Sequence, residues 1–355
     1  MEIEHIENKV IKGGRISEDE ALLLFKSDDI FSIGRMASKR AYEINRDKVF
    51  YIHNRHINPT NICVNRCAFC AFSRSPGQKG AYEMAIDEIL KRAESAVEEG
   101  AIELHIVGGL HPERPFNFYI DMLKKIKDNF PDIYIKAFTA VEIDYFSKIS
   151  GLSIEEVLRS LIDAGLDCMP GGGAEIFDVR VRNRICPEKI SGRRWLEIME
   201  IAHNLGIRTN ATMLYGHVEG YEERVDHLNR LRELQDRTGG FQAFIPLPFL
   251  PKNTEIPDAS YTSGIDDIKT IAISRIFLDN IPHIKAYWIM LGPKIAQLSL
   301  CFGADDLEGT VIEEKIANSA GGMTKGSMTE HELIHIIKKA KKIPVKRDSL
   351  YREIG

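Results

Sequence analysis

From Lys48 onward, extended runs alternate with amphipathic helical runs over most of the 355-residue chain. The repeat is roughly 30 to 40 residues long, which is typical of parallel βα units. Eight extended runs can be placed, over residues 49–57, 102–107, 133–138, 166–169, 207–214, 241–247, 284–289 and 304–308. The pattern predicts an α/β fold, specifically a closed (β/α)8 TIM-type barrel, with an open six-stranded barrel as the alternative.

Helical segments flank the barrel pattern, so we expect three parts within one catalytic domain. Residues 1–46 form an N-terminal helical extension, in which Ser17 and Glu20 have the spacing of a capping box. Residues 47–309 form the barrel, and residues 310–355 form a C-terminal helical extension packed on it. We interpret the basic run 338–347 as a solvated helix face rather than a nucleic-acid-binding tail.

The charge balance argues against two classes of partner. The net charge is −5, whereas proteins that bind nucleic acid or an anionic membrane surface usually carry a basic excess. No apolar run approaches the roughly 20 residues of a membrane span, and the acidic N-terminus has no hydrophobic signal core. We therefore expect a cytoplasmic protein, and its six cysteines suit a reducing compartment better than a disulfide framework.

Three cysteines follow the first predicted strand, in the spacing Cys63-x3-Cys67-x2-Cys70. A tetrahedral zinc ion needs a fourth ligand, for which His53 and His56 are nearby in sequence. A cubane iron–sulfur cluster needs four ligands as well. If only three of them come from the protein, one iron stays open for a substrate. The spacing by itself indicates a metal centre and leaves zinc and iron–sulfur open.

Glycine-rich turns follow two other predicted strands. Gly108 and Gly109 end the second strand, where the absence of Cβ atoms allows a close approach of another group. Gly171, Gly172 and Gly173 follow the fourth strand and lead to Glu175. The triple glycine can cradle a phosphate, or support a nucleoside whose ribose lies near the carboxylate of Glu175. We prefer the nucleoside because no Lys-Ser/Thr follows as in a P-loop, and a plain tight turn is the third possibility.

A polar group of three residues ends the fifth predicted strand. Tyr215, His217 and Glu219 lie at the mouth of the expected barrel, where the working residues of such barrels gather. They are candidate catalytic residues, able to bind a substrate or move a proton. Cys168, Cys186 and Cys301 lack the paired spacing of metal ligands and are expected to be ordinary buried thiols, so we assign no chemistry to them.

The cysteine loop resembles the cluster-binding loop of the radical S-adenosylmethionine (SAM) superfamily. This resemblance implies a 4Fe–4S cluster whose irons are held by Cys63, Cys67 and Cys70, with SAM chelating the fourth iron. It also implies that Phe69 lies against the adenine and that the Gly108-Gly109 backbone receives the amino group of SAM. A low-potential electron donor, flavodoxin or ferredoxin, is implied as a partner. A non-catalytic zinc or iron–sulfur protein is the alternative from another class.

Further segments narrow the resemblance to the aminofutalosine synthase family of the futalosine route to menaquinone. They are residues 171–177, 210–219, 224–228, 234–242, 303–307 and 344–348. The resemblance implies a radical SAM transferase that adds the 5′-deoxyadenosyl radical to 3-[(1-carboxyvinyl)oxy]benzoate. Aryl migration and loss of carbon dioxide then give 6-amino-6-deoxyfutalosine. The alternative within the fold is cyclic dehypoxanthine futalosine synthase, a hydrogen-abstracting cyclase of the same pathway.

A dianionic aromatic substrate of this kind needs cationic partners for its carboxylates. The candidates are Arg74, just past the cysteine loop, and Arg180, Arg182 and Arg184, which follow the triple glycine. Arg182 is the one we assign to the catalytic group. One departure from the family pattern is Leu250, at a place where the family is expected to carry histidine, so a substrate contact there is in doubt.

Overall fold

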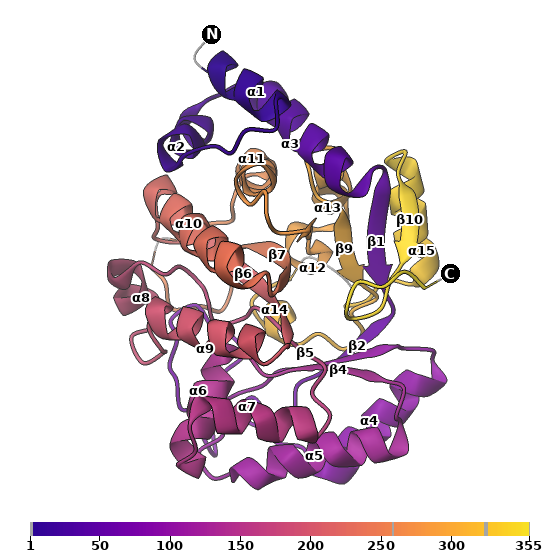
Figure 1. Ribbon diagram of the computed structural model, residues 1–355. Helices are drawn as coiled ribbons and strands as arrows, with labels where there is room; N and C mark the ends of the chain where they lie inside the picture. The colour runs from indigo at the N-terminus through magenta and orange to yellow at the C-terminus, as the bar shows by residue number, and fades with distance from the viewer. Residues whose placement is uncertain (1–2, 258, 323–325, 355) are drawn as a thin grey trace.

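A parallel sheet of seven strands forms the body of the protein (Figure 1). The computed structural model describes residues 3–257, 259–322 and 326–354. The strands run in the order β2-β3-β4-β5-β6-β7-β8, so each one pairs with its neighbours in sequence. They are β2 (Asn54–Ile57), β3 (Glu103–Ile106), β4 (Tyr134–Ala137), β5 (Cys168–Met169), β6 (Arg208–Tyr215), β7 (Phe241–Pro248) and β8 (His283–Ile284). Sequential parallel pairing is what repeated βα units produce.

Two further strands join the edges of this sheet. Strand β1 (Lys48–Ile52) leads into β2 with only His53 between them, and β1 pairs in parallel with β9 (Asp306–Gly309). A parallel bridge between Lys285 and Asp306 connects the β8 edge to β9. These pairings complete the ring of strands, and the expected TIM-type fold is confirmed. The predicted strand over residues 304–308 corresponds to β9.

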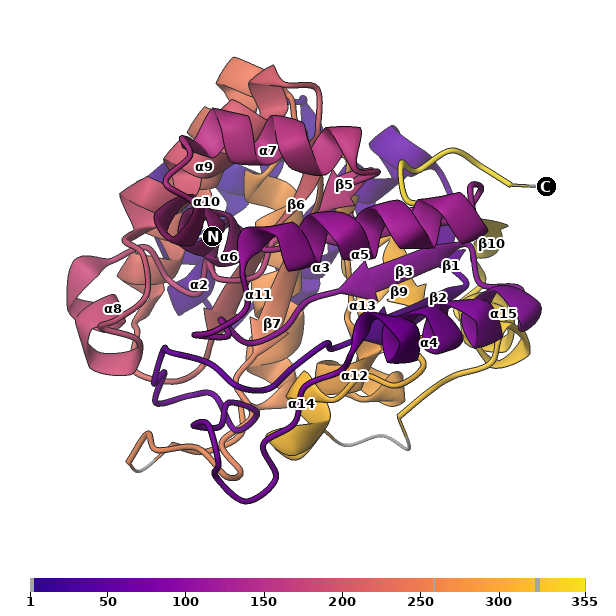
Figure 2. The ribbon, with the colours of Figure 1, turned by 90° about the horizontal axis from the view of Figure 1, so that it is seen from below.

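Helices on the outside of the ring follow most of the strands (Figures 1 and 2). They are α4 (Ile86–Glu98), α5 (Phe116–Asn129), α6 (Ala140–Ser150), α7 (Ile154–Asp163), α8 (Val179–Ile185), α9 (Gly192–Asn204), α10 (Tyr221–Thr238), α11 (Gly264–Phe277) and α13 (Pro293–Ser299). The sequence did not predict α6, which begins with a capping box between Thr139 and Glu142. The strand expected over residues 284–289 is shorter than predicted, because residues Trp288–Leu291 form the helix α12.

The two ends of the chain pack against the barrel. In the N-terminal extension, α2 (Glu18–Lys26) contacts α10 and α11, α3 (Ile30–Asn45) contacts α11, and α1 (Glu4–Ile11) contacts α3 (Figure 1). The capping box of Ser17 and Glu20 is present at the start of α2. At the other end, α14 (Ile316–Ser319) and α15 (Glu330–Lys339) precede β10 (Ile343–Lys346), which pairs in parallel with β1. The sequence did not predict β10. None of the described helices combines the length and apolar character that a bilayer crossing needs.

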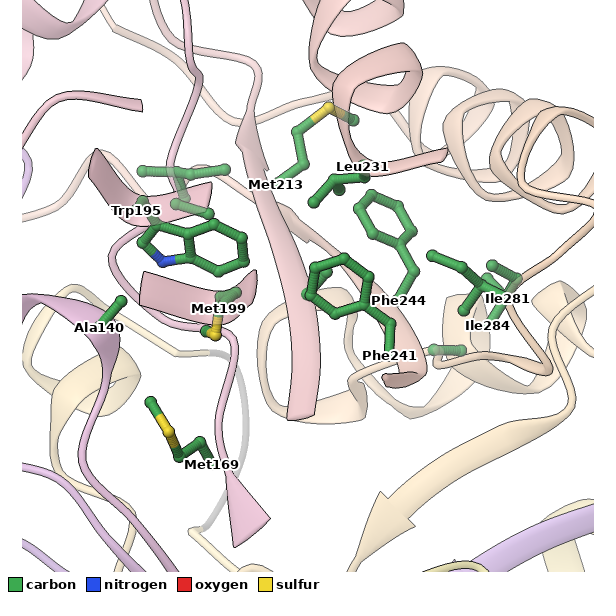
Figure 3. Close-up of a cluster of buried hydrophobic side chains, with 14 of the residues drawn as sticks. Ala140, Met169, Trp195, Met199, Met213, Leu231, Phe241, Phe244, Ile281 and Ile284 are labelled. Carbon is green, nitrogen blue, oxygen red and sulfur yellow. The ribbon is translucent and has the colours of Figure 1, made fainter. Parts of the chain in front are cut away.

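A buried hydrophobic core packs side chains of the helix layer, such as Trp195 and Leu231, against those of the strands, such as Phe241 (Figure 3). Trp195 of α9 is fully buried and stacks on Phe241 of β7, with ring centroids 6.1 Å apart. Burying an aromatic side chain of this size contributes about 1.5–3 kcal/mol. The indole Nε1 of Trp195 also donates a hydrogen bond to the carbonyl of Gly172, at 3.1 Å. The core therefore fixes the position of the triple-glycine loop.

Inside the barrel, buried charges are neutralised in pairs. The ammonium of Lys136 lies 2.6 Å from Glu103, and Lys285 bonds to Glu308. The amide of Asn54 donates to both carboxylates at 3.3 Å. Burial raises the pKa of Glu103, but the Lys136 ammonium outweighs burial and holds this pKa at about 2. A buried charge without a partner is expensive, so these contacts form a fixed polar floor beneath the carboxyl ends of the strands.

Candidate active site

A cavity of about 330 Å³ opens at the carboxyl ends of the barrel strands. It is lined by the cysteine loop after β2, the glycine turns after β3 and β5, and side chains of β6, β7 and α14. The lining includes Cys63, Cys67, Phe69, Cys70, Gly108, Gly109, Gly171, Gly172, Gly173 and Glu175. All of the predicted metal- and cofactor-binding residues therefore meet in one cavity. In Figure 2, the loop between β2 and α4, drawn in deep purple, lies on the same side of the molecule as α8 and α14.

Backbone hydrogen bonds hold the cysteine loop in place. The amide of Cys63 donates to the carbonyl of Arg74 at 3.1 Å, and that of Cys70 donates to the carbonyl of Cys67 at 2.9 Å. The neighbouring amide of Val64 donates to the carbonyl of Leu110 at 3.0 Å, which ties the loop to the turn after β3. The three thiols are therefore presented to the cavity by a loop whose backbone is already paired.

The donor set of this loop fits an iron–sulfur cluster better than a single zinc ion. Around one tetrahedral zinc, with Zn–S distances of about 2.3 Å, the sulfur atoms lie roughly 4 Å apart. In the described chain, the group of potential ligands within 4.8 Å of one another is Glu103, His105 and Glu308, and the three cysteines do not form such a group. Their wider spacing suits a larger core, and soft thiolates suit iron–sulfur clusters. His53 pairs with Glu330 at 2.9 Å and is not part of the lining.

The glycines are required first by contacts within the protein. A Cβ atom on Gly109 would lie 2.2 Å from the carbonyl oxygen of Ile62, directly before Cys63. A Cβ on Gly171 would lie 2.7 Å from backbone atoms of Ala211 on β6. The amide of Gly108 donates to the carboxylate of Glu142 at 3.2 Å, and burial raises the pKa of Glu142 to about 7. The glycine turns thus allow the loops around the cavity to pack closely together.

Lys189 links three features of the cavity and was not predicted from the sequence. Its ammonium lies 2.8 Å from a carboxylate oxygen of Glu175 and 4.8 Å from the centre of the Phe69 ring. Burial lowers the pKa of Lys189, but the neighbouring Cys67 and Glu175 raise it more. The lysine therefore stays charged and offsets negative charge between the cysteine loop and the triple-glycine loop.

Arg182 supports the triple-glycine loop instead of lining the cavity. Its guanidinium donates hydrogen bonds to the carbonyls of Gly173, Ala174 and Ile176, at 3.3, 2.6 and 3.1 Å. A fourth bond goes to the carbonyl of Ile190 at 2.5 Å. This buried clamp makes Arg182 a positioning residue. Its placement does not support the catalytic role expected from the sequence.

The polar group after β6 also lies outside the cavity lining. The hydroxyl of Tyr215 donates to Asp267 at 2.8 Å. His217 lies 3.1 Å from Glu219, whose carboxylate pairs with Arg224 at 2.9 Å. Burial lowers the pKa of His217, which favours a neutral imidazole. These contacts brace the loop between β6 and α10, and the placement of Tyr215, His217 and Glu219 does not support direct contact with substrate.

The remaining arginine candidates have other contacts too. Arg74 donates to the carbonyls of Ala71 and Ser73, at 2.9 and 2.7 Å. Arg180 is exposed and bonds to Glu223, and Arg184 is exposed and does not line the cavity. Leu250 does line the cavity, so its apolar side chain replaces the imidazole expected there.

Several cavity residues were missed by sequence reasoning. They are His105, Glu142, Lys189, Asn210, Thr212, Tyr287 and Glu308, whereas His56 had been considered only as a fourth zinc ligand. His56 and His105 lie on β2 and β3, two positions after the inward-facing Asn54 and Glu103. Polar residues at alternate positions of two neighbouring strands are a signal that could have identified this pair.

A barrel of parallel strands with three cysteines and glycine turns around one cavity defines the radical SAM class of enzymes. The family model described as "Radical SAM superfamily" matches residues 57–231, and "CofH/MqnC C-terminal region" matches residues 238–354. Aminodeoxyfutalosine synthase from Thermus thermophilus is 47% identical over 353 residues, which covers 98% of this chain and 95% of that protein. The chain therefore belongs to the radical SAM superfamily, and within it to the aminodeoxyfutalosine synthases and their relatives.

Relatives with other names are also similar to this chain. A 5-amino-6-(D-ribitylamino)uracil–L-tyrosine 4-hydroxyphenyl transferase from Methanopyrus kandleri is 41% identical, with 100% of this chain and 97% of that protein covered. A cyclic dehypoxanthine futalosine synthase from Streptomyces coelicolor is 39% identical, with 99% and 89% covered. The family models and the match to the Thermus enzyme confirm the expected family, the radical SAM chemistry, and the 4Fe–4S cluster and SAM as cofactors.

Solved structures support the fold. The hydrogenase maturase HydG from Carboxydothermus hydrogenoformans gives a TM-score of 0.77 at 17% identity, with 99% of this chain and 81% of that chain covered. Methylornithine synthase (PylB) gives 0.76 at 16% identity, with 95% and 96% covered. At such low identity the likeness concerns the architecture alone, and it agrees with the ring of parallel strands.

Proposed function

We propose that this protein is an aminodeoxyfutalosine synthase. It joins the 5′-deoxyadenosyl group of SAM to 3-[(1-carboxyvinyl)oxy]benzoate, with rearrangement and loss of carbon dioxide, and releases 6-amino-6-deoxyfutalosine for menaquinone biosynthesis. The observation that carries the proposal is the 47% identity to the Thermus enzyme over nearly the whole of both chains. It exceeds the 41% and 39% identity to the transferase and cyclase relatives.

The proposal assigns the cofactor site to residues that line the cavity. Cys63, Cys67 and Cys70 hold the cluster, which when bound supplies the electron that cleaves SAM into methionine and a 5′-deoxyadenosyl radical. Phe69 lies against the adenine, and the backbone at Gly108 and Gly109 receives the amino group of SAM. The carboxylate of Glu175 accepts hydrogen bonds from the ribose hydroxyls. Support comes from their common placement around one cavity.

The chain's own residues keep this reaction away from water. Leu214, Ile245, Leu247, Phe249 and Leu250 form an apolar wall of the cavity. An apolar wall excludes water and strengthens the electrostatic interactions of the bound groups. Lys189 contacts both Glu175 and Phe69 and so fixes their positions beside the cysteine loop. The protein thus orients SAM and shields the reacting carbon atoms.

We also propose the division of the chain into three parts, the electron donor and the cellular compartment that the sequence indicated. Residues 47–309 form the catalytic barrel, with extensions at 1–46 and 310–355. A flavodoxin or ferredoxin supplies electrons to the cluster in the cytoplasm. The free thiols of all six cysteines are compatible with a reducing compartment. Cys168 and Cys186 are buried as expected, but the expectation was wrong for Cys301, which is exposed.

Mass spectrometry of an anaerobic reaction tests the function. The reconstituted protein is mixed with SAM, dithionite and 3-[(1-carboxyvinyl)oxy]benzoate, and Cys67→Ala serves as the matched control. We expect a product that carries both adenosine and the benzoate from the wild type and none from the variant. Formation of 5′-deoxyadenosine alone would reject the substrate, and the cyclase substrate would then be tested in the same way.

A further inference from the structure

Two histidines lie side by side at the inner end of the cavity. His56 on β2 and His105 on β3 are register partners in parallel strands. Their rings stack with centroids 4.4 Å apart and an interplanar angle of 29°. Both residues line the cavity, and they belong to the barrel strands themselves, so their positions are fixed by the sheet.

The imidazoles have hydrogen-bonding capacity that the protein does not use. In the described part of the chain, His56 Nε2 and His105 Nδ1 are buried without a hydrogen-bond partner. His203, which is buried elsewhere, pairs both ring nitrogens with Thr238 and Thr209, at 2.7 and 2.8 Å. A buried polar atom without a partner costs stability. The contrast indicates that the first two rings are available to a ligand.

The floor beneath them is a closed charge network and not a metal site. Ligand atoms of Glu103, His105 and Glu308 come within 4.8 Å of one another. The ammonium groups of Lys136 and Lys285 already pair with the two carboxylates, and two positive charges at this place would repel a divalent cation. The two carboxylates are balanced by the two ammonium groups, so the floor does not repel an anion.

An anionic ligand that reaches the end of the cavity near His56 and His105 needs hydrogen-bond donors there. Among the lining residues that the structure describes, the side chains that can carry positive charge are His56, His105 and Lys189, and none is an arginine. Lys189 is already engaged by Glu175 near the cysteine loop. Burial lowers the pKa of His56 to about 4 and lowers that of His105 further below its usual range. Each ring is therefore neutral at pH 7 and offers one N–H donor.

We propose that His56 and His105 bind a carboxylate of the aromatic acid substrate through their ring N–H groups. This inference rests on the proposed function, which supplies a dianionic acid. The histidine pair then determines which end of the substrate points into the barrel and which end faces the SAM site. They act as substrate-binding and specificity-determining residues, a role that the sequence analysis had given to arginines.

Binding measurements without reductant test the pair separately from turnover. Isothermal titration calorimetry gives the dissociation constant of 3-[(1-carboxyvinyl)oxy]benzoate for protein reconstituted with the cluster and saturated with SAM. We expect His56→Phe and His105→Phe each to raise this constant about tenfold or more, because phenylalanine keeps the stacked ring but cannot donate a hydrogen bond to the charged carboxylate. For the control His203→Phe, the dissociation constant of the acid is expected to stay within about twofold of wild type. The SAM dissociation constant of all variants is expected to stay within the same range.

The two monomethyl esters of the acid identify the carboxylate concerned. The monoester that blocks the carboxylate bound by the histidines should bind the wild type and the histidine variants equally weakly. The other monoester should still bind the wild type more tightly than the variants. If the diacid bound the wild type and both variants with equal affinity, the inference would be overturned. Product formation by the wild type would still support the proposed function in that case. A wild type that binds the dimethyl ester as tightly as the diacid would overturn the inference as well, even if a variant fails to fold. A wild type that neither binds nor converts the acid would reject the proposed function itself.

Discussion

The substitution Gly109→Ala tests whether the close backbone contact in the Gly108-Gly109 turn is needed for SAM cleavage. The added Cβ would lie 2.2 Å from the carbonyl oxygen of Ile62. Ordinary carbon–oxygen contacts are about 3.3–3.6 Å, so one backbone must move by about 1 Å. Overpacking of this kind costs about 1–3 kcal/mol. Because Ile62 directly precedes Cys63, the movement displaces the cysteine loop relative to the turn that faces SAM.

The expected loss of function is larger than the loss of stability. A misplacement of about 1 Å can reduce a rate about 100-fold, whereas a domain with about 5–15 kcal/mol of stability remains folded. The assay is anaerobic SAM cleavage, followed as 5′-deoxyadenosine by liquid chromatography, together with urea unfolding.

Gly206→Ala is the matched control for this prediction. Gly206 has a φ of +85°, but its added Cβ meets nothing within 4 Å, and it lies before β6 at the opposite end of the barrel from the cavity. It should lose about 1–2 kcal/mol through backbone strain and cleave SAM at the wild-type rate. If Gly109→Ala cleaved SAM as fast as Gly206→Ala, the packing argument would be refuted.

Three further predictions concern buried polar groups. Arg182→Ala removes the clamp on the triple-glycine loop, and we expect at least about 3 kcal/mol of destabilisation in urea unfolding together with weaker SAM binding. Lys136→Ala leaves Glu103 without its ammonium partner and should cost about 3–5 kcal/mol in the same assay, while unchanged stability would contradict the charge network. The folded-state pKa of His56, about 4, lies below its unfolded value of about 6.5. The unfolded chain therefore binds more protons between pH 4 and pH 6.5. The contribution of His56 to the free energy of unfolding is complete above pH 6.5 and falls by about 3 kcal/mol towards pH 4. His56→Gln should flatten this part of the unfolding profile relative to wild type.

Local sequence signals were sufficient for most of the architecture. Ser17 and Ser153 each start a helix with the capping box that their spacing indicated. The strands that end in the cysteine loop and the Gly108-Gly109 turn were placed to within a few residues, because apolar runs ended by glycine or proline are strong strand signals. Helix α6 was missed although Thr139 and Glu142 have the same capping-box spacing, because residues 139–143 directly follow the predicted strand over 133–138 and were interpreted as its end.

The site was predictable where the chemistry is local in sequence and not where it depends on tertiary contacts. Three cysteines within eight residues predict a metal centre from the sequence alone. Lys189 lies in the connection between α8 and α9, and nothing in its neighbours indicates that it reaches Glu175 and Phe69. Arg182 was expected in the cavity because it follows the triple glycine, but the helix α8 turns its guanidinium back onto the loop carbonyls.

Isotope transfer from SAM distinguishes adenosylation of the aromatic acid from simple cleavage of SAM. The reaction uses SAM labelled with carbon-13 in the ribose, 3-[(1-carboxyvinyl)oxy]benzoate and a chemical reductant under anaerobic conditions. We expect one labelled adenosine in each product molecule and one carbon dioxide released for each product formed. Label found only in 5′-deoxyadenosine, with the aromatic acid unchanged, would contradict adenosylation of the acid.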